Sequence, residues 1–165
     1  MKTIVAPIDF SAVTDRVFEV AASLAEALRG RVVLLHVVQA SQVPTEGVTS
    51  PEALQTAIAA AEQSASRRLA RYEKRLQLDK LNVSKVMLRG VPAPQILEWS
   101  VKLRASFLVM GSHGHSVVKG RLLGSTAEDV LSRAPCPVIV VPHPKSNRTR
   151  PPWTEASGTR SPVSR

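Results

Sequence analysis

Three glycines and a serine in the last third of the chain have a spacing that suits phosphate binding. In the run GSHGHSVVKGRLLGST at residues 111–126, Gly111 and Gly114 are followed by Gly124 and Ser125 in the pattern G-x2-G-x9-G-[ST]. Glycine can take positive φ values and lets the main chain close on a ligand, which we expect of Gly111 and Gly114. Gly124 and Ser125 precede an apolar-periodic stretch typical of a helix, whose first N–H groups favour an anion. The run therefore predicts a phosphate site.

Other readings of the same run stay open. A glycine-punctuated surface loop with Ser125 as an ordinary N-cap has the same spacing. His113 can donate to a ribose or phosphate oxygen or simply fill the loop, and Lys119 and Arg121 can balance phosphate charge or form a solvated face. The chain has no G-x4-G-K-[ST] sequence, so the lysine and the magnesium-binding hydroxyl of a phosphate loop are missing. This absence argues against rapid hydrolysis.

Strands alternating with helices must position this run. The apolar segments at 2–8 and 31–38 are typical of strands buried on both faces, and a helix capped by Ser11 or Thr14 and ended by Gly30 lies between them. We also expect helices at 51–78, after Pro92 and at 125–133, and strands at 82–89, 106–110 and 137–141. This order predicts an α/β protein whose parallel sheet is covered on both faces.

Asp9 stands just past the first expected strand, as Gly111 stands just past the fourth. Ligands of open parallel sheets bind beyond the carboxyl ends of the strands, where the winding reverses. If the two strands are neighbours, a carboxylate and a phosphate loop face each other across one crevice, as a nucleotide requires. The alternative for Asp9 is an Asx-turn or a helix cap.

Four motifs, in order along the chain, resemble the universal stress protein family over residues 1–142. They are PIDFS at 7–11, LLHVV at 34–38, MGSHGHSVVKGRLLGSTAEDVL at 110–131 and APCPVIVV at 134–141. The resemblance implies a Rossmann-like three-layer α/β/α sandwich with a five-stranded parallel sheet of order 3-2-1-4-5. It also implies a dimer and, because the glycine run marks the ATP-binding branch, ATP as the ligand with Mg²⁺ held through the phosphates.

The resemblance assigns binding roles to particular positions. Asp9 matches the acidic residue that meets the ribose or adenine, Pro7 shapes the turn before it, and Val38 matches the residue whose backbone recognises adenine. The positions matched to the ribose and phosphate loop and to the phosphate-binding helix start are Met110, Gly111, His113, Gly114, Gly124, Ser125 and Thr126. No position is matched to a catalytic group or to a metal ligand. We expect His36 to be a core histidine and His115 and His143 to be solvated.

The charge of the chain is concentrated at one end. The formal net charge is +9, and residues 142–165 carry five basic residues against one acidic residue, which is +4 of that total. We therefore expect a nucleotide-binding domain at 1–142 and a basic Pro/Ser/Arg-rich tail at 143–165, unstructured in the free protein, with no nucleic-acid partner. No apolar stretch is long enough to cross a bilayer and Cys136 is the only cysteine, so we expect a cytoplasmic protein with a buried thiol.

These features favour an ATP-binding stress-response or regulatory module that changes conformation or partners with nucleotide occupancy. A slow ATPase or phosphate-donor enzyme is the alternative, and an adaptor acting through the basic tail is a third reading. The apolar segment Pro137 to Val141 would lie at a sheet edge, which predicts a homodimer through this strand. Residues 40–50 are expected to form a flap near the ligand.

Overall fold

The computed structural model describes residues 1–39, 43, 49–78, 80–115 and 122–142. The loop at 40–50, apart from residues 43, 49 and 50, and the tail at 143–165 with His143 lie outside the described residues. The elements are β1 (Thr3–Pro7), α1 (Thr14–Ala27), β2 (Arg31–Val38), α2 (Pro51–Leu78), β3 (Asn82–Arg89), α3 (Pro92–Lys102), β4 (Phe107–Gly111), α4 (Ser125–Arg133) and β5 (Val138–Val141). Strands and helices alternate as the sequence predicts.

All five strands are parallel and lie in the order β3-β2-β1-β4-β5, which confirms the expected sheet. β1 is central, with Ile4 opposite Val32 of β2 on one side and opposite Phe107 of β4 on the other. The chain winds outward from β1 in both directions, so the winding reverses between β1 and β4. The carboxyl ends of these two strands, at Pro7 and Gly111, therefore flank the place where such sheets bind ligands.

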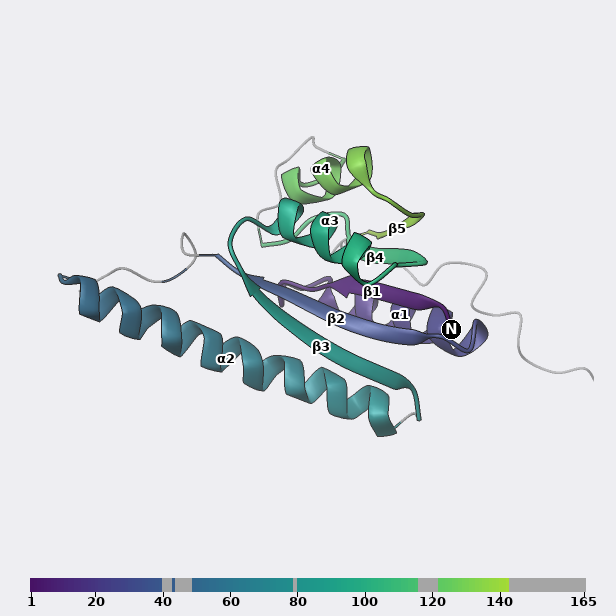
Figure 1. The fold of residues 1–165 in the computed structure, drawn as a ribbon, viewed down its shortest axis with the longest axis horizontal. Coiled ribbons are helices and arrows are strands. Elements are labelled where there is room, and N and C mark those ends of the chain that lie inside the picture. The colour runs from purple at the N-terminus through teal and green to yellow at the C-terminus, as the bar shows by residue number, and fades with distance from the viewer. Residues whose placement is uncertain (40–42, 44–48, 79, 116–121, 143–165) are drawn as a thin grey trace, which may run out of the picture.

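Two apolar clusters cover the two faces of the sheet. Side chains of α1 and α2 pack with Ile4, Leu34 and Val109 on one face, and side chains of α3 and α4 pack with Val5 and Leu108 on the other. Figure 1 shows α3 and α4 together on one side of the sheet and the long α2 running beside β3. Successive residues of β1 and β4 point to opposite faces and both faces are covered, which explains why burial is nearly continuous along these strands and why their sequences are largely apolar.

The long helix α2 joins the core mainly through its second half. Ala65, Leu69 and Leu76 are buried, whereas Leu54 and Ile58 in the first half are only half-buried. The predicted apolar stripe therefore has the right period, but only its C-terminal part is fully covered by the sheet.

The ends of α1 differ from the sequence expectation. Val13 is the N-cap and no side chain caps the helix, so neither Ser11 nor Thr14 has the expected role. At the other end the left-handed residue is Arg29, with φ 47°, and not Gly30. Glycine is required at position 30 for a different reason, because a Cβ there would lie 2.7 Å from the carbonyl oxygen of Lys2.

Cys136 is half-buried rather than fully buried, and it packs against the cluster formed with α3 and α4. Burial raises the pKa of its thiol. Among the described helices, none combines the length and the apolar character that crossing a membrane requires.

Candidate functional site

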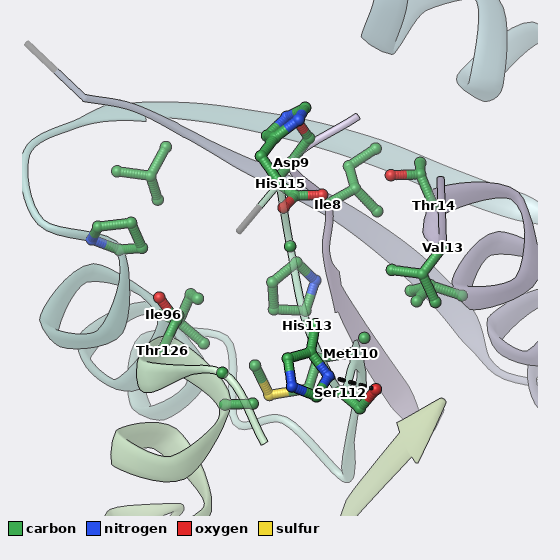
Figure 2. Close-up of a pocket in the computed structure, with 18 of the residues that line it drawn as sticks. Ile8, Asp9, Val13, Thr14, Ile96, Met110, Ser112, His113, His115 and Thr126 are labelled. Atoms are coloured by element: carbon green, nitrogen blue, oxygen red, sulfur yellow. Dashed lines mark hydrogen bonds between the residues drawn. The ribbon is translucent and has the colours of Figure 1, made fainter. Parts of the chain in front are cut away.

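A pocket of about 290 Å³ opens at the carboxyl ends of β1, β2 and β4. In Figure 2, Asp9 and His115 lie at one end of the pocket and Ser112 and His113 at the other. Ile96 of α3 and Thr126 of α4 are on the side opposite Val13 and Thr14, which belong to the start of α1. The structure thus places a cavity where the reversal of the sheet winding predicts one.

Nine of the ten sequence-predicted site residues line this pocket: Pro7, Asp9, Met110, Gly111, His113, Gly114, Gly124, Ser125 and Thr126. Val38 does not line it, whereas its neighbours Val37 and Gln39 do. The carbonyl oxygen of Val38 accepts a hydrogen bond from Gly90 N–H at 3.1 Å. Because successive side chains of a strand point to opposite faces, Val37 and Gln39 share the face that looks into the pocket.

The glycines do not act as the sequence predicts. Neither Gly111 nor Gly114 has a positive φ, so the expectation of left-handed glycines here is wrong. Both are needed for close approach: a Cβ at Gly111 would collide with the Val13 side chain, and one at Gly114 with Oδ2 of Asp9. Gly124 is different, since its φ of −75° and ψ of 158° suit any residue and a Cβ there would make only ordinary contacts.

The start of α4 faces the pocket with its first backbone N–H groups. Gly124 is the N-cap, Ser125 is the first helical residue, and no side chain caps the helix. This corrects the alternative in which Ser125 is the N-cap. The N–H of Gly124 donates to the carbonyl of Ser112 at 2.7 Å, which fixes the helix start against the end of β4. The next N–H groups have no intrahelical acceptor and attract an anion.

Charged side chains are scarce around the pocket. Within the described part of its lining, Asp9 is the one carboxylate and there is no lysine or arginine. Lys119 and Arg121 lie outside the described residues. No three described His, Cys, Asp or Glu side chains are grouped so that they could hold a metal ion.

Asp9 joins the two sides of the pocket. Its Oδ1 accepts a hydrogen bond from Ser11 N–H at 2.9 Å, so the Asx-turn interpretation holds for one carboxylate oxygen. Its backbone carbonyl accepts a hydrogen bond from Nε2 of His115 at 2.8 Å. His115 is exposed as expected, but it is not merely solvated, because it ties the loop after β4 to the loop after β1. Sequence spacing gave no signal for this contact.

Phe10, next to Asp9, is the strained residue of the site. Its φ of 64° lies in the left-handed region, which costs a bulky residue on the order of 1–3 kcal/mol. The ring centroid lies 4.5 Å from that of His36, and the guanidinium carbon of Arg68 lies 4.1 Å from the ring centroid. Arg68 also donates through Nη2 to the Phe10 carbonyl at 3.2 Å. Contacts from β2 and α2 therefore hold this conformation.

His36 is a satisfied core histidine, as the sequence predicts. It is 8% exposed, and Nδ1 lies 2.8 Å from the Ile8 carbonyl, so this nitrogen carries the proton and donates. Burial lowers the pKa of His36, and its hydrogen bond to Ile8 and the nearby Asp9 charge only partly oppose this effect. The imidazole is therefore held neutral beneath the Asp9 turn.

Three buried side-chain atoms lack a hydrogen-bond partner among the described residues: Ser11 Oγ, Thr14 Oγ1 and His113 Nε2. Thr14 and His113 line the pocket, and Ser11 is part of the Asp9 turn. The other ring nitrogen of His113 lies 3.2 Å from Ser112 Oγ, as the dashed line in Figure 2 marks. Burying a polar atom without a partner costs about 1–3 kcal/mol. The grouping of such atoms around this pocket therefore indicates a candidate binding site.

Comparison with known proteins places the fold in a family. Residues 1–142 match the Universal stress protein family. The chain belongs to the universal stress protein family. Universal stress protein MJ0531 of Methanocaldococcus jannaschii is 32% identical over 144 residues, a match that covers 87% of this chain and 84% of that protein.

Solved structures of this family have the same architecture. Hypothetical protein MJ0577 of the same archaeon superimposes with a TM-score of 0.77 at 25% identity, covering 88% of this chain and 98% of that one. The universal stress protein from Archaeoglobus fulgidus in complex with dAMP has a TM-score of 0.60 at 22% identity, covering 85% and 97%. At least one protein with this fold therefore binds an adenine nucleotide.

Proposed function

We propose that this universal stress protein binds ATP in the pocket between β1 and β4 and acts as a regulatory module that changes conformation or partners with nucleotide occupancy. The observation that carries the proposal is the collection of unpaired polar atoms around that pocket. Thr14 Oγ1 and His113 Nε2 are buried without partners where the sheet winding reverses. A polar ligand bound here would pair with these groups after a rearrangement that exposes them.

Each side of the pocket suits a different part of a nucleotide. The N–H groups at the start of α4, together with the Ser125 and Thr126 hydroxyls, are donors suited to phosphates. Asp9 is the acceptor suited to ribose hydroxyls or to the edge of adenine. Mg²⁺ would be held through the phosphates, since the described residues offer no group of metal ligands. Bound Mg²⁺ would offset phosphate charge that the described lining leaves unbalanced.

The same residues support a conformational response. The unpaired polar atoms raise the free energy of this conformation relative to one in which they find partners. A ligand shifts an equilibrium only through its different affinity for two states. Nucleotide that pairs with these groups in an altered arrangement would supply that difference.

Slow hydrolysis is the alternative activity. Asp9 is the one carboxylate in the described lining, and its Oδ1 already accepts from Ser11 N–H. This lining offers no lysine or arginine to stabilise a developing phosphate charge. The arrangement therefore favours holding ATP over turning it over. Phosphate release over many turnovers, lost in the binding variants below, would favour the enzyme instead.

The first experiment asks whether the protein retains and responds to nucleotide. Purified protein is denatured, its supernatant is analysed for adenine nucleotides, and the thermal shift on adding Mg²⁺-ATP is measured. The double variant Ser125→Ala/Thr126→Val should lose most of the shift. Ser132→Ala, at the other end of α4 with its hydroxyl bonded to Asp129, is the matched control and should keep the shift. No retained nucleotide and no shift in the wild type would overturn the proposal.

The edge strand β5 supports a homodimer as part of this proposal. Val138–Val141 pairs on one side with β4 and leaves its other edge unpaired within the described residues. Ile139 lines a shallow groove with α1 beside this edge. Apolar edge strands invite pairing with another chain. Sedimentation velocity at micromolar concentration should give a dimer, and a monomer would contradict this part of the proposal.

A further inference from the structure

Helix α2 reaches the loop that carries Asp9 through Arg68 and Tyr72, whose ring stacks on that of Phe10 with centroids 6.5 Å apart. Arg68 and Phe10 are 58 residues apart in the chain, yet the guanidinium group contacts Phe10 twice. One contact is the hydrogen bond from Nη2 to the Phe10 carbonyl at 3.2 Å, and the other places the guanidinium carbon 4.1 Å from the centroid of the ring. A planar guanidinium can make both contacts at once, which an ammonium cannot.

These contacts act on the residue whose backbone is strained. Phe10 has a φ of 64°, a conformation that phenylalanine adopts only when its surroundings hold it there. Arg68 donates to its carbonyl, and the guanidinium group of Arg68 packs against its side chain together with the rings of His36 and Tyr72. If these contacts were lost, Phe10 would relax toward negative φ, and the direction of the chain on either side of it would change.

Asp9 and Ser11 are the neighbours that such a change would move. The hydrogen bond from Ser11 N–H to Asp9 Oδ1 spans Phe10, so a change in the Phe10 backbone would alter its geometry. The same carboxylate approaches Gly114 so closely that a Cβ there would collide with Oδ2. The orientation of the Asp9 carboxylate in the pocket therefore depends on Phe10.

We propose that Arg68 is a positioning residue for the nucleotide site, which holds Phe10 in its left-handed conformation and so fixes the Asp9 carboxylate in the pocket. This inference rests on the proposed function for its effect on affinity, but not for its effect on the Asp9 turn. By linkage, anything that moves α2 then alters nucleotide affinity, and bound nucleotide restrains α2 by the same free energy. The position or mobility of helix α2 would therefore depend on whether nucleotide is bound.

The test on the turn needs no ligand. Residue-resolved amide hydrogen exchange is measured at Ser11 in the full chain. Arg68→Ala should speed exchange at Ser11 about fivefold or more, because the turn opens more often. Arg67→Ala is the matched control: Arg67 is also exposed on α2, and its side chain makes no hydrogen bond or ion pair with the described residues. Equal exchange at Ser11 in both variants would overturn the inference.

The test on the site uses a double-mutant cycle with Asp9→Asn. Asparagine keeps the acceptor for Ser11 N–H and removes the charge. Arg68→Ala should weaken Mg²⁺-ATP binding about fivefold in the wild-type background and have no further effect in the Asp9→Asn background. Arg68→Lys should recover little of the lost affinity. An ammonium group is a compact point charge and lacks the planar, multi-donor shape of the guanidinium group.

The two proposals fail in different ways. A wild type that binds no ATP contradicts the proposed function, while exchange at Ser11 still decides whether Arg68 holds the turn. Equal losses from Arg68→Ala in both backgrounds would show that Arg68 acts through its charge and not through Asp9. Equal losses from Arg68→Ala and Arg67→Ala would lead to the same conclusion and overturn the inference.

Discussion

The two sides of the pocket are built by opposite means. The side after β4 is mostly backbone: Gly111 and Gly114 allow close approach, Gly124 begins α4, and none of these glycines has a positive φ. The side after β1 depends on side chains from elsewhere. Phe10 is strained there, and His36 of β2 and Arg68 of α2 hold it.

This difference separates what is encoded locally from what depends on the whole fold. Glycine spacing along one segment identifies the β4 side, because Gly111 and Gly114 lack the side chains that would collide with Val13 and Asp9. The β1 side needs contacts of Phe10 with His36 and Arg68, which lie 26 and 58 positions away in the sequence. Only the assembled sheet and α2 bring these residues together. We therefore expect substitutions at the glycines after β4 to act through steric overlap with neighbouring groups. Substitutions on the β1 side should act through the orientation of the Asp9 loop.

The largest effect should come from Gly111. In Gly111→Ala the new Cβ would collide with Val13, which is 2% exposed, and would lie 3.1 Å from the His113 carbonyl oxygen. Chemical denaturation should show a loss of about 2 kcal/mol in the free energy of unfolding. The control Gly124→Ala should lose less than about 1 kcal/mol, because only a helix N-cap is changed. Equal losses would show that the two glycines do not differ as their surroundings indicate.

A smaller effect is expected from His113, which among the described residues of the β4 side is the one with a buried side-chain atom that lacks a partner. His113→Phe keeps most of the volume and removes both Nε2, which has no partner among the described residues, and Nδ1, which lies 3.2 Å from Ser112 Oγ. Affinity for Mg²⁺-ATP should fall about tenfold, the value of one hydrogen bond of roughly 1.4 kcal/mol. The unfolding midpoint without ligand should change little. Unchanged affinity in calorimetric titration would show that Nε2 does not meet the nucleotide.

Most of the fold and one side of the site could be predicted from the sequence. Unbroken apolar runs such as 31–38 indicate buried parallel strands, and the helix bounds at 51–78 and 125–133 follow from apolar period and flanking residues. The motif combination led to the correct family and strand order. Nine of the ten expected site residues line the pocket, because a motif preserves local spacing and the sheet brings the motifs together.

The rest could not be predicted, for physical reasons. Spacing does not reveal whether glycine is needed for its φ or for close approach, so the expectation of positive φ at Gly111 and Gly114 was wrong. The contacts of His115 with Asp9 and of Arg68 with Phe10 join distant segments and leave no local pattern. Phe10 occupies a conformation that its own propensity opposes, and only tertiary contacts reveal it.

The β1 side should respond to pH through His36. Burial lowers the pKa of His36 below 6.5, so below that pH the unfolded chain binds a proton that the folded protein resists. Stability present above pH 6.5 should therefore decline as the pH falls from 6.5 toward the folded pKa. His36→Asn keeps a donor for the Ile8 carbonyl and cannot titrate. Denaturation between pH 8 and 5 should show a shallower decline for this variant, and parallel curves would contradict the assignment.

The smallest effect concerns the ionisation of the Tyr72 hydroxyl, which has no consequence at neutral pH. Burial, with a hydrogen bond donated to Asp15 Oδ1 at 2.9 Å, raises the pKa of Tyr72 to about 12. The chain has one tyrosine, so ultraviolet titration reports this residue alone. The midpoint should lie near 12, compared with about 10 in denatured protein, and should fall in Asp15→Asn. A folded midpoint near 10 would show that α2 is not held against α1 at this point.

The central claim is that the pocket between β1 and β4 holds ATP, and titration calorimetry of the wild type and of Gly124→Val tests it most directly. Gly124 has a backbone conformation that valine can adopt, and its surroundings leave room for a Cβ, so the variant should fold. Saturable binding of Mg²⁺-ATP is expected for the wild type. Affinity should be at least about tenfold weaker in the variant, because the added side chain crowds the start of α4. No saturable binding in the wild type, or equal affinity in both proteins, would contradict the account.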